Sequence, residues 1–216
     1  MNRRAMDPKN PLPSRPASAL ATSLLLLASI AMLSLAACKG GSTASEPPPL
    51  EGARIGGDFT LTDKRGKTVR AADFAGRYRT VYFGYTFCPD VCPLDVQVMM
   101  KGYRLFAKGH PELAAKIAPL FITIDPARDT PAVVGQFAAH FGKELTGLTG
   151  TDAQVSAVAR AFAVYYKKGQ DAGSGGYLMD HSRAAYLMGP EGQPIALLPV
   201  DKDAKAVAAE LAKWVH

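Results

Sequence analysis

Cys88 and Cys92 carry the clearest chemistry in this sequence. They lie in a Cys-Pro-Asp-Val-Cys-Pro segment between an apolar run and a helical pattern. Pro93 disfavours helical geometry at Cys92, so we expect both thiols to lie on a loop. Pro89 and Asp90 suit the centre of a type I turn, which would bring the two sulfurs together. The N-terminus of the following helix adds positive potential and favours the thiolate, which is the form that binds metals.

Copper is the metal that these donors suit. Two soft sulfurs suit Cu(I), and an imidazole suits Cu(I) or Cu(II), so two cysteines and one histidine can hold both oxidation states. His181 is the best-placed histidine because it follows a Gly-rich stretch at residues 169–176, as a ligand that swings onto a metal would. We expect the remaining histidines to be solvent-exposed surface residues: His110, His140 and His216. From the residues alone, His181 fits a surface position as well as a ligand position.

Other uses of the cysteine pair leave two alternatives open. Structural zinc usually takes four protein ligands, and this set offers three. Haem c attachment needs Cys-x-x-Cys-His, which this sequence lacks. A peroxiredoxin-like peroxidase would need Thr-x-x-Cys, whereas Thr86 lies only two residues before Cys88. Thiol redox chemistry at Cys88 and Cys92 stays open, and so does a structural disulfide, although so short a loop removes little unfolded-state entropy.

Alternating strands and helices around these residues predict an α/β fold with a mixed central sheet flanked by helices. We expect strands at residues 59–62, 67–70, 79–86, 117–124, 164–167, 183–188 and 195–198, and helices at residues 94–108, 130–141, 151–162 and 201–215. Thr130 and Thr151 are the expected N-caps of two of these helices. A cysteine pair at a strand-to-helix turn is where thioredoxin-like folds place their chemistry, so we expect that fold.

Two further groups of residues could serve the site or the fold. Asp125, Arg128 and Asp129 form a polar loop at the carboxyl end of an expected strand, where α/β folds commonly place functional groups. Capping and turn formation explain the same three residues equally well. Met99 and Met100 offer thioether ligands, but their position within a helix favours core packing.

The first residues indicate export and membrane attachment. A basic start precedes an apolar run at residues 19–37, which is typical of a signal peptide, so we assign residues 1–37 to it. Residues 35–38, Leu-Ala-Ala-Cys, resemble a bacterial lipobox, in which Cys38 would carry the lipid anchor. An uncleaved transmembrane anchor is the alternative, because the run approaches the length of a spanning helix. Residues 38–53 are then anchor and flexible linker, and residues 54–216 form the domain.

The charge of the chain gives no argument for nucleic-acid binding. The formal net charge is +6, but Arg3, Arg4, Lys9 and Arg15 lie in the leader against the single acid Asp7. The later basic residues are scattered, whereas phosphate binding needs them clustered on one face. With no heptad pattern, the domain is most simply a monomer.

Three blocks of this sequence resemble the Sco/SenC family. They are Gly-Tyr-Thr-Phe-Cys-Pro-Asp-Val-Cys-Pro at residues 84–93, Thr-Ile-Asp-Pro-Ala-Arg-Asp-Thr-Pro at residues 123–131, and Asp-His-Ser followed by Tyr-Leu at residues 180–187. The family comprises membrane-anchored, thioredoxin-like proteins that bind copper and help metallate the CuA site of cytochrome c oxidase. The resemblance spans roughly residues 55–216. Family members usually have a transmembrane helix where this chain has the lipobox-like segment.

The resemblance implies one copper ion per chain, held by Cys88, Cys92 and His181. It further implies a metallochaperone that takes copper from a donor and passes it to the CuA-bearing oxidase subunit, at the outer, periplasmic side of a membrane. The alternative is a thiol-disulfide reductase that keeps the CuA cysteines reduced, which would make the chain an enzyme. That role uses Cys88 and Cys92 but does not need His181.

Overall fold

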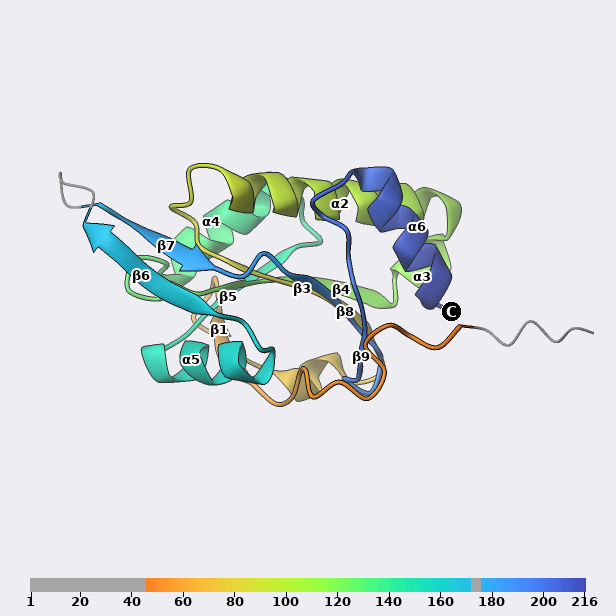
Figure 1. The fold of residues 1–216 in the computed structure, drawn as a ribbon, viewed down its shortest axis with the longest axis horizontal. Helices are drawn as coiled ribbons and strands as arrows, with labels where there is room; N and C mark the ends of the chain where they lie inside the picture. The colour runs from red at the N-terminus through yellow and green to blue at the C-terminus, as the bar shows by residue number, and fades with distance from the viewer. Residues whose placement is uncertain (1–45, 172–175) are drawn as a thin grey trace, which may run out of the picture. The chain divides into compact units, whose positions relative to one another are not determined.

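A seven-stranded sheet lies at the centre of the domain, and its middle strands are the apolar runs of the sequence (Figure 1). β3 (Tyr78–Gly84) and β4 (Ile117–Thr123) are buried at every position. They pair in parallel, and helices cover both of their faces, which explains their continuous rather than alternating hydrophobicity. Pro119 is the third residue of β4.

The computed structural model describes residues 46–171 and 176–216. Its compact unit runs from Pro47 to His216. The expected signal peptide, the lipobox cysteine Cys38 and the first part of the linker lie outside the described residues. Leu50, which falls within the expected linker, donates a backbone hydrogen bond to Ile195 at 3.0 Å. In the described part, no helix is both long enough and apolar enough to cross a membrane.

The main sheet is mixed, with strand order β2-β1-β5-β4-β3-β8-β9. Its remaining strands are β1 (Thr60–Asp63), β2 (Thr68–Arg70), β5 (Thr146–Thr149), β8 (Ala185–Met188) and β9 (Pro194–Leu197). β3, β4 and β5 are parallel, and the other neighbours pair antiparallel. A separate antiparallel hairpin, β6 (Tyr166–Asp171) with β7 (Tyr177–His181), projects from one end of the sheet (Figure 1).

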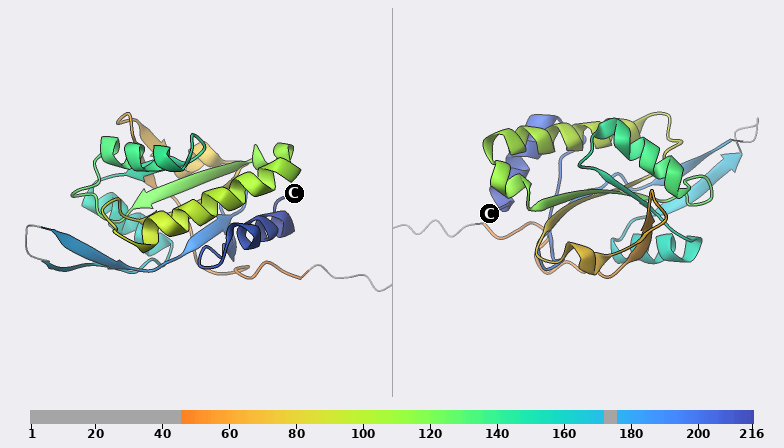
Figure 2. Two further views of the ribbon diagram at one scale, coloured as in Figure 1. Left: turned by 90° about the horizontal axis from the view of Figure 1, so that it is seen from above. Right: turned by 180° about the vertical axis from the view of Figure 1, so that it is seen from behind.

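Helices cover both faces of the main sheet (Figures 1 and 2). One face carries α2 (Val91–Gly109), α3 (Pro111–Ala114), α4 (Pro131–Phe141) and α6 (Ala204–Trp214), and the other carries the short 3-10 helix η1 (Ala71–Phe74) and α5 (Asp152–Ala161). Thr130 and Thr151 cap α4 and α5 as expected, each accepting a hydrogen bond from a backbone amide in the first turn. The mixed sheet between helical layers confirms the expected α/β architecture.

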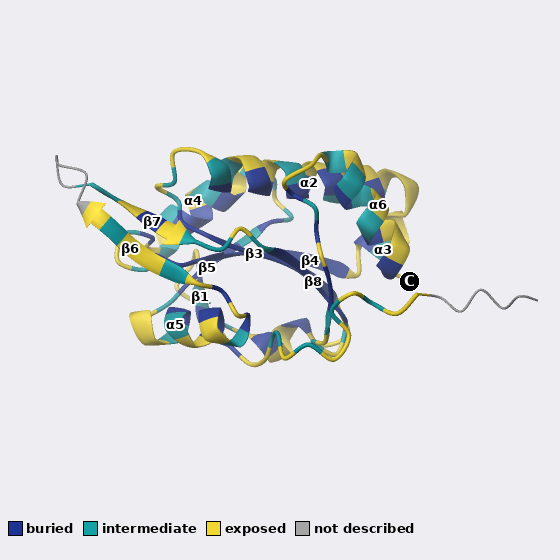
Figure 3. Ribbon diagram, in the orientation of Figure 1, coloured by how far each residue is buried: buried dark blue, intermediate teal, exposed yellow. Residues whose placement is uncertain are grey.

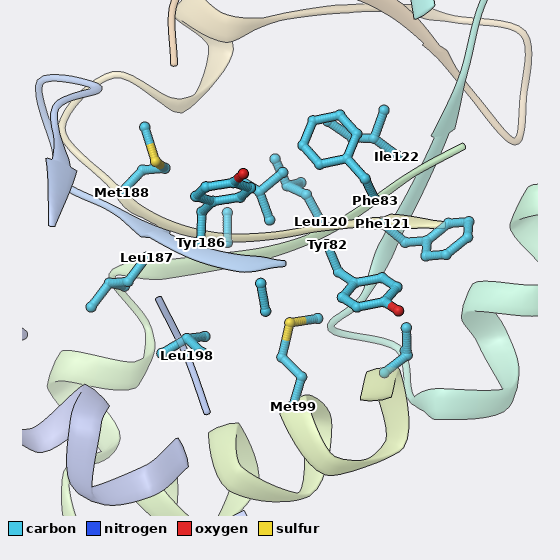
Figure 4. Close-up of a cluster of buried hydrophobic side chains, with 14 of the residues drawn as sticks. Tyr82, Phe83, Met99, Leu120, Phe121, Ile122, Tyr186, Leu187, Met188 and Leu198 are labelled. Atoms are coloured by element: carbon cyan, nitrogen blue, oxygen red, sulfur yellow. The ribbon is translucent and has the colours of Figure 1, made fainter. Parts of the chain in front are cut away.

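The hydrophobic core fills the space between the sheet and both helical layers (Figure 3). Successive residues of β3 point to opposite faces: Phe83 lies on one side of the sheet, while Tyr82 lies on the other with Met99 of α2 (Figure 4). Met99 and Met100 have no exposed surface. Their position confirms that both methionines are core residues rather than copper ligands.

Three strand predictions were wrong. β5 was not expected, because its Thr-Gly-Leu-Thr sequence is short and weakly apolar. β6 begins at Tyr166 rather than residue 164 and extends into the stretch expected to be a Gly-rich loop. β7 was also not expected, so His181 is the last residue of a strand rather than part of a loop. β6 and β7 form by pairing with each other. The types of the individual residues do not encode that pairing, so the sequence did not reveal either strand correctly.

Candidate metal centre

The end of β3 delivers Cys88 and Cys92 to one edge of the sheet. After Gly84 the chain makes a turn in which the Cys88 amide donates to the Tyr85 carbonyl at 3.3 Å. A Cβ atom at Gly84 would lie 3.2 Å from the Cys92 sulfur, so the absence of a side chain there leaves room for the thiol. Pro89 and Asp90 form a bend without a hydrogen-bonded turn, and the expected type I turn at these residues is therefore wrong.

Cys92 lies in the first turn of α2 rather than on a loop. The helix begins at Val91, which makes Pro93 its third residue. The first backbone N–H groups of any helix have no intrahelical acceptor, so a proline at this position removes no helical hydrogen bond. The Cys88 sulfur accepts a hydrogen bond from the Cys92 amide at 3.4 Å and so occupies the N-terminus of the helix.

His181 meets Cys92 from the end of β7. Its Nε2 atom lies 3.2 Å from the Cys92 sulfur, and its Nδ1 atom lies 2.9 Å from the backbone carbonyl oxygen of Ser182. A carbonyl only accepts hydrogen bonds, so Nδ1 carries the proton and the lone pair of Nε2 faces the sulfur. The ring of Tyr85 packs edge-on against the imidazole, with 6.0 Å between ring centroids.

Burial sets the protonation of both groups. Desolvation raises the pKa of the Cys92 thiol well above its ordinary value, even though its hydrogen bonds to Tyr85 and Tyr82 act the other way. Desolvation likewise lowers the pKa of His181, which favours the neutral imidazole. The expectation that Cys92 favours the thiolate is therefore wrong for the metal-free protein, because desolvation has the largest effect on its pKa.

The polar loop at residues 125–129 has a structural task. Asp129 is fully buried and accepts hydrogen bonds from the Thr86 amide at 3.0 Å and the Thr123 hydroxyl at 2.6 Å. Asp125 accepts hydrogen bonds from Arg128 and, at 2.7 Å, from the Tyr177 hydroxyl. These contacts tie the ends of β3 and β4 to each other and to the β6–β7 hairpin.

Neither Asp125 nor Asp180 accepts a hydrogen bond from the imidazole of His181. Asp125 is engaged with Arg128 and Tyr177, and Asp180 is exposed. The Ser182 carbonyl takes that role. The remaining histidines, His110, His140 and His216, are all exposed as expected.

An ion pair between a buried aspartate and an exposed arginine lies beside the site and was missed in the sequence. Asp95 of α2 pairs with Arg183, with Arg183 Nη2 2.6 Å from Asp95 Oδ1. The available signals were positional: Asp95 lies one helical turn after Cys92, and Arg183 lies two residues after His181. Spacing alone does not show that residues 88 positions apart meet.

The structure thus brings Cys92 and His181 into contact and places the Cys88 sulfur at the Cys92 amide. Within residues 46–171 and 176–216, no three of the His, Cys, Asp and Glu side chains converge as a metal cluster. The donor set fits copper, because both cysteines are free thiols and the imidazole is neutral.

Comparison with known sequences identifies one family. Residues 47–216 match the family model described as SCO1/SenC. The chain is 41% identical over 144 residues to the Bos taurus protein "Protein SCO2 homolog, mitochondrial", covering 66% of this chain and 53% of that protein. It is 39% identical over 157 residues to Protein SenC of Rhodobacter capsulatus, covering 72% of this chain and 66% of that protein. The chain spans about half the length of its mammalian relatives.

Solved structures agree on the fold. The copper-bound crystal structure of Arabidopsis thaliana ScoI aligns with a TM-score of 0.69 and 33% identity, covering 74% of this chain and 96% of that chain. The thioredoxin domain of a thiol-disulfide oxidoreductase from Bacteroides vulgatus aligns with a TM-score of 0.52 and 17% identity, covering 75% of this chain and 96% of that domain. These matches confirm the thioredoxin-like fold.

Proposed function

Because the chain belongs to the SCO1/SenC family, we propose that it is a copper metallochaperone. In this proposal, the reduced protein holds one copper ion through Cys88, Cys92 and His181 and delivers it to the CuA site of cytochrome c oxidase. The observation that carries the proposal is the 3.2 Å contact between Cys92 Sγ and His181 Nε2, which joins residues 89 positions apart.

Cys88, Cys92 and His181 would contribute differently to copper binding. Cys92 is buried and protonated in the metal-free protein, so it must lose its proton when it takes up copper. Cys88 is only partly buried and gives the site its solvent-facing sulfur. Two thiolates suffice for Cu(I), whereas Cu(II) prefers a larger shell that includes nitrogen, which the neutral His181 supplies.

A second candidate function is thiol-disulfide reduction of the CuA cysteines. The observation in its favour is a pair of free thiols at a strand-to-helix turn, of which one is accessible and one buried. In this reaction the Cys88 sulfur would attack the target disulfide, and Cys92 would then displace the target thiol. The target gains two electrons and two protons, and this chain keeps a Cys88–Cys92 disulfide.

The cellular setting is part of the same proposal. A chain attached through Cys38, or through a helix in the leader, would hold the domain at the outer, periplasmic side of a membrane. There it would meet its copper donor and the CuA-bearing oxidase subunit. The expectations of a monomer and of no nucleic-acid partner belong to this proposal as well.

The His181→Ala variant separates the two functions, because it removes one metal ligand and leaves both thiols. We expect the reduced wild-type protein to bind one copper ion, the disulfide form to bind none, and His181→Ala to lose Cu(II) more than Cu(I). The matched control is His140→Ala, which removes an exposed histidine in α4, far from His181 in the sequence. Metal analysis, oxidase assembly in cells and a dithiol reductase assay provide the measurements.

Two outcomes decide between the candidates. Failed CuA assembly with retained reductase activity in His181→Ala supports the metallochaperone. Normal CuA assembly by a His181→Ala protein that carries no copper would replace it with the reductase.

A further inference from the structure

A buried carboxylate beside the candidate copper site accepts three hydrogen bonds from two other segments. Asp95 is 1% exposed and accepts a hydrogen bond from the Tyr82 hydroxyl at 2.9 Å. Arg183 donates to the same carboxylate twice, through Nη2 to Oδ1 at 2.6 Å and through Nε to Oδ2 at 3.0 Å. This bidentate geometry fixes the orientation of both side chains as well as their distance.

The ion pair joins the two parts of the chain that carry the candidate ligands. Asp95 follows Cys92 by three residues and therefore lies on the same side of α2, one turn further on. Arg183 follows His181 by two residues, in the short segment between β7 and β8 that belongs to neither strand. A contact that holds Arg183 in place therefore also restrains the backbone of the residues that follow His181.

The neighbouring Ser182 is held by the residue that precedes β6. The Ser182 amide donates to the Tyr165 carbonyl at 2.9 Å, and the Tyr165 amide donates to the Ser182 hydroxyl at 3.1 Å. The hairpin projects from the body of the domain (Figure 1). The pair between Asp95 and Arg183, in contrast, attaches this segment to the helix that carries Cys92.

We infer that Asp95 and Arg183 are positioning residues of the copper site. Their ion pair holds the segment after His181 against α2, and this keeps the imidazole Nε2 facing the Cys92 sulfur. Neither residue is a copper ligand. The inference rests on the proposed function, and it adds two residues to the site that the ligand set alone does not include. Outer partners of metal ligands typically alter metal affinity about 10- to 100-fold.

Arg183→Met tests the inference because it removes the charge and both donors but keeps a long apolar stem. Arg183→Lys restores the charge without the bidentate geometry and should rescue the site only in part. The matched control is Arg65→Met. Arg65 also donates Nε and Nη2 to a mostly buried carboxylate, that of Asp63, but it does so in the turn between β1 and β2.

We expect Arg183→Met to lower Cu(II) affinity about tenfold or more and to shift the thiolate-to-copper absorption band and the electron paramagnetic resonance spectrum. Cu(I) affinity should fall less, because two thiolates remain. Arg65→Met should match the wild type in all three readouts. An Arg183→Met protein with wild-type affinity and spectra would overturn the inference, and so would an equal loss of affinity in Arg65→Met.

The metal-free protein provides an independent test. Amide hydrogen exchange at residues 181–184 should be faster in Arg183→Met than in the wild type, and Arg65→Met should leave it unchanged. If the wild type binds no copper, the proposed function fails, but faster exchange would still support the positioning role. Unchanged exchange would reject that role whatever the copper result.

Asp95→Asn completes the design as a double-mutant cycle. If the two side chains act as one unit, Asp95→Asn combined with Arg183→Met should affect Cu(II) binding no more than the more severe single variant. Additive losses would show that the two residues act separately and would contradict the inference.

Discussion

Asp129 is the most deeply buried acidic residue of the described domain, with no exposed surface. It connects the turn before Cys88 to the loop after β4, through hydrogen bonds from Thr86 and Thr123. Burial raises the pKa of the Asp129 carboxyl, whereas these hydrogen bonds lower it and the nearby Asp125 raises it further. The net direction is upward, so the Asp129 carboxyl keeps its proton to a higher pH in the folded protein than in the unfolded chain.

This direction predicts how pH acts on stability through Asp129. A carboxyl whose folded pKa is raised contributes stability that is fully present below its unfolded value of 3.8 and is lost as pH rises through the folded pKa. Asp129→Asn cannot ionise and serves as the reference. We compare the two proteins by the difference in their free energy of unfolding, wild type minus variant. We expect this difference to fall as the pH is raised above 3.8 and then to level off. Urea unfolding across this range checks the prediction, and a difference that rises with pH would show that the hydrogen bonds outweigh burial.

The types of the candidate ligands could be predicted from the sequence, but their protonation states could not. Cys88 and Cys92 stand out by residue type and spacing, whereas His181 became the expected third ligand only through the resemblance to the Sco/SenC family. Burial decides the protonation of Cys92, and it depends on packing by β3 and β7 that the local sequence does not specify.

The packing of α2 on α6 is an element-scale feature that depends on a glycine. Gly102 is buried in α2, and a Cβ atom placed there would lie 2.5 Å from Cβ of Val207 and 3.0 Å from the carbonyl oxygen of Ala204. The two helices therefore approach more closely than a side chain at this position would permit. Glycine normally weakens a helix interior, so close helix packing explains its presence here.

Gly102→Ala should destabilise the domain even though alanine is the better helix former. The helix gains about 1 kcal/mol from the substitution, but overpacking at a buried contact costs about 1–3 kcal/mol. The control is Gly109→Ala at the end of the same helix, where a Cβ atom meets nothing within 4 Å. Thermal or urea unfolding should show a loss for Gly102→Ala and no loss for Gly109→Ala. A stabilised Gly102→Ala protein would mean that α6 can shift without cost.

Elements with local determinants could be predicted from the sequence, whereas those that depend on distant partners could not. Thr130 and Thr151 define their helices through caps within a few residues, and both helices begin where expected. β7 needs β6 as a partner, and the start of α2 depends on how strictly Pro93 restricts Cys92. The pair of Asp95 and Arg183 joins residues 88 positions apart, so it becomes visible only in the folded chain.

At the scale of the whole domain, the candidate copper site lies at one end of the sheet, and the first described residues and the C-terminus lie at the other. The first described residues run beside β9, close to the C-terminus, while α2 begins at the other end next to the β6–β7 hairpin (Figures 1 and 2). The 19 residues of α2 span about 28 Å at 1.5 Å per residue. The proposed N-terminal anchor would therefore join the described domain at the end of the sheet away from the candidate site.

Acylation of Cys38 is the prediction that belongs to this scale. Residues 35–38 follow a basic and apolar leader, and a diacylated N-terminal cysteine would hold the domain stably at a membrane, because two acyl chains bind far more strongly than one. Mass spectrometry of the membrane-extracted protein should find a lipid-modified Cys38 at the mature N-terminus, and Cys38→Ser should abolish that processing. Copper binding by the reduced domain should be equal in both proteins, since Cys88, Cys92 and His181 are untouched. An intact Met1 or an unmodified Cys38 in the mature protein would instead support the transmembrane anchor.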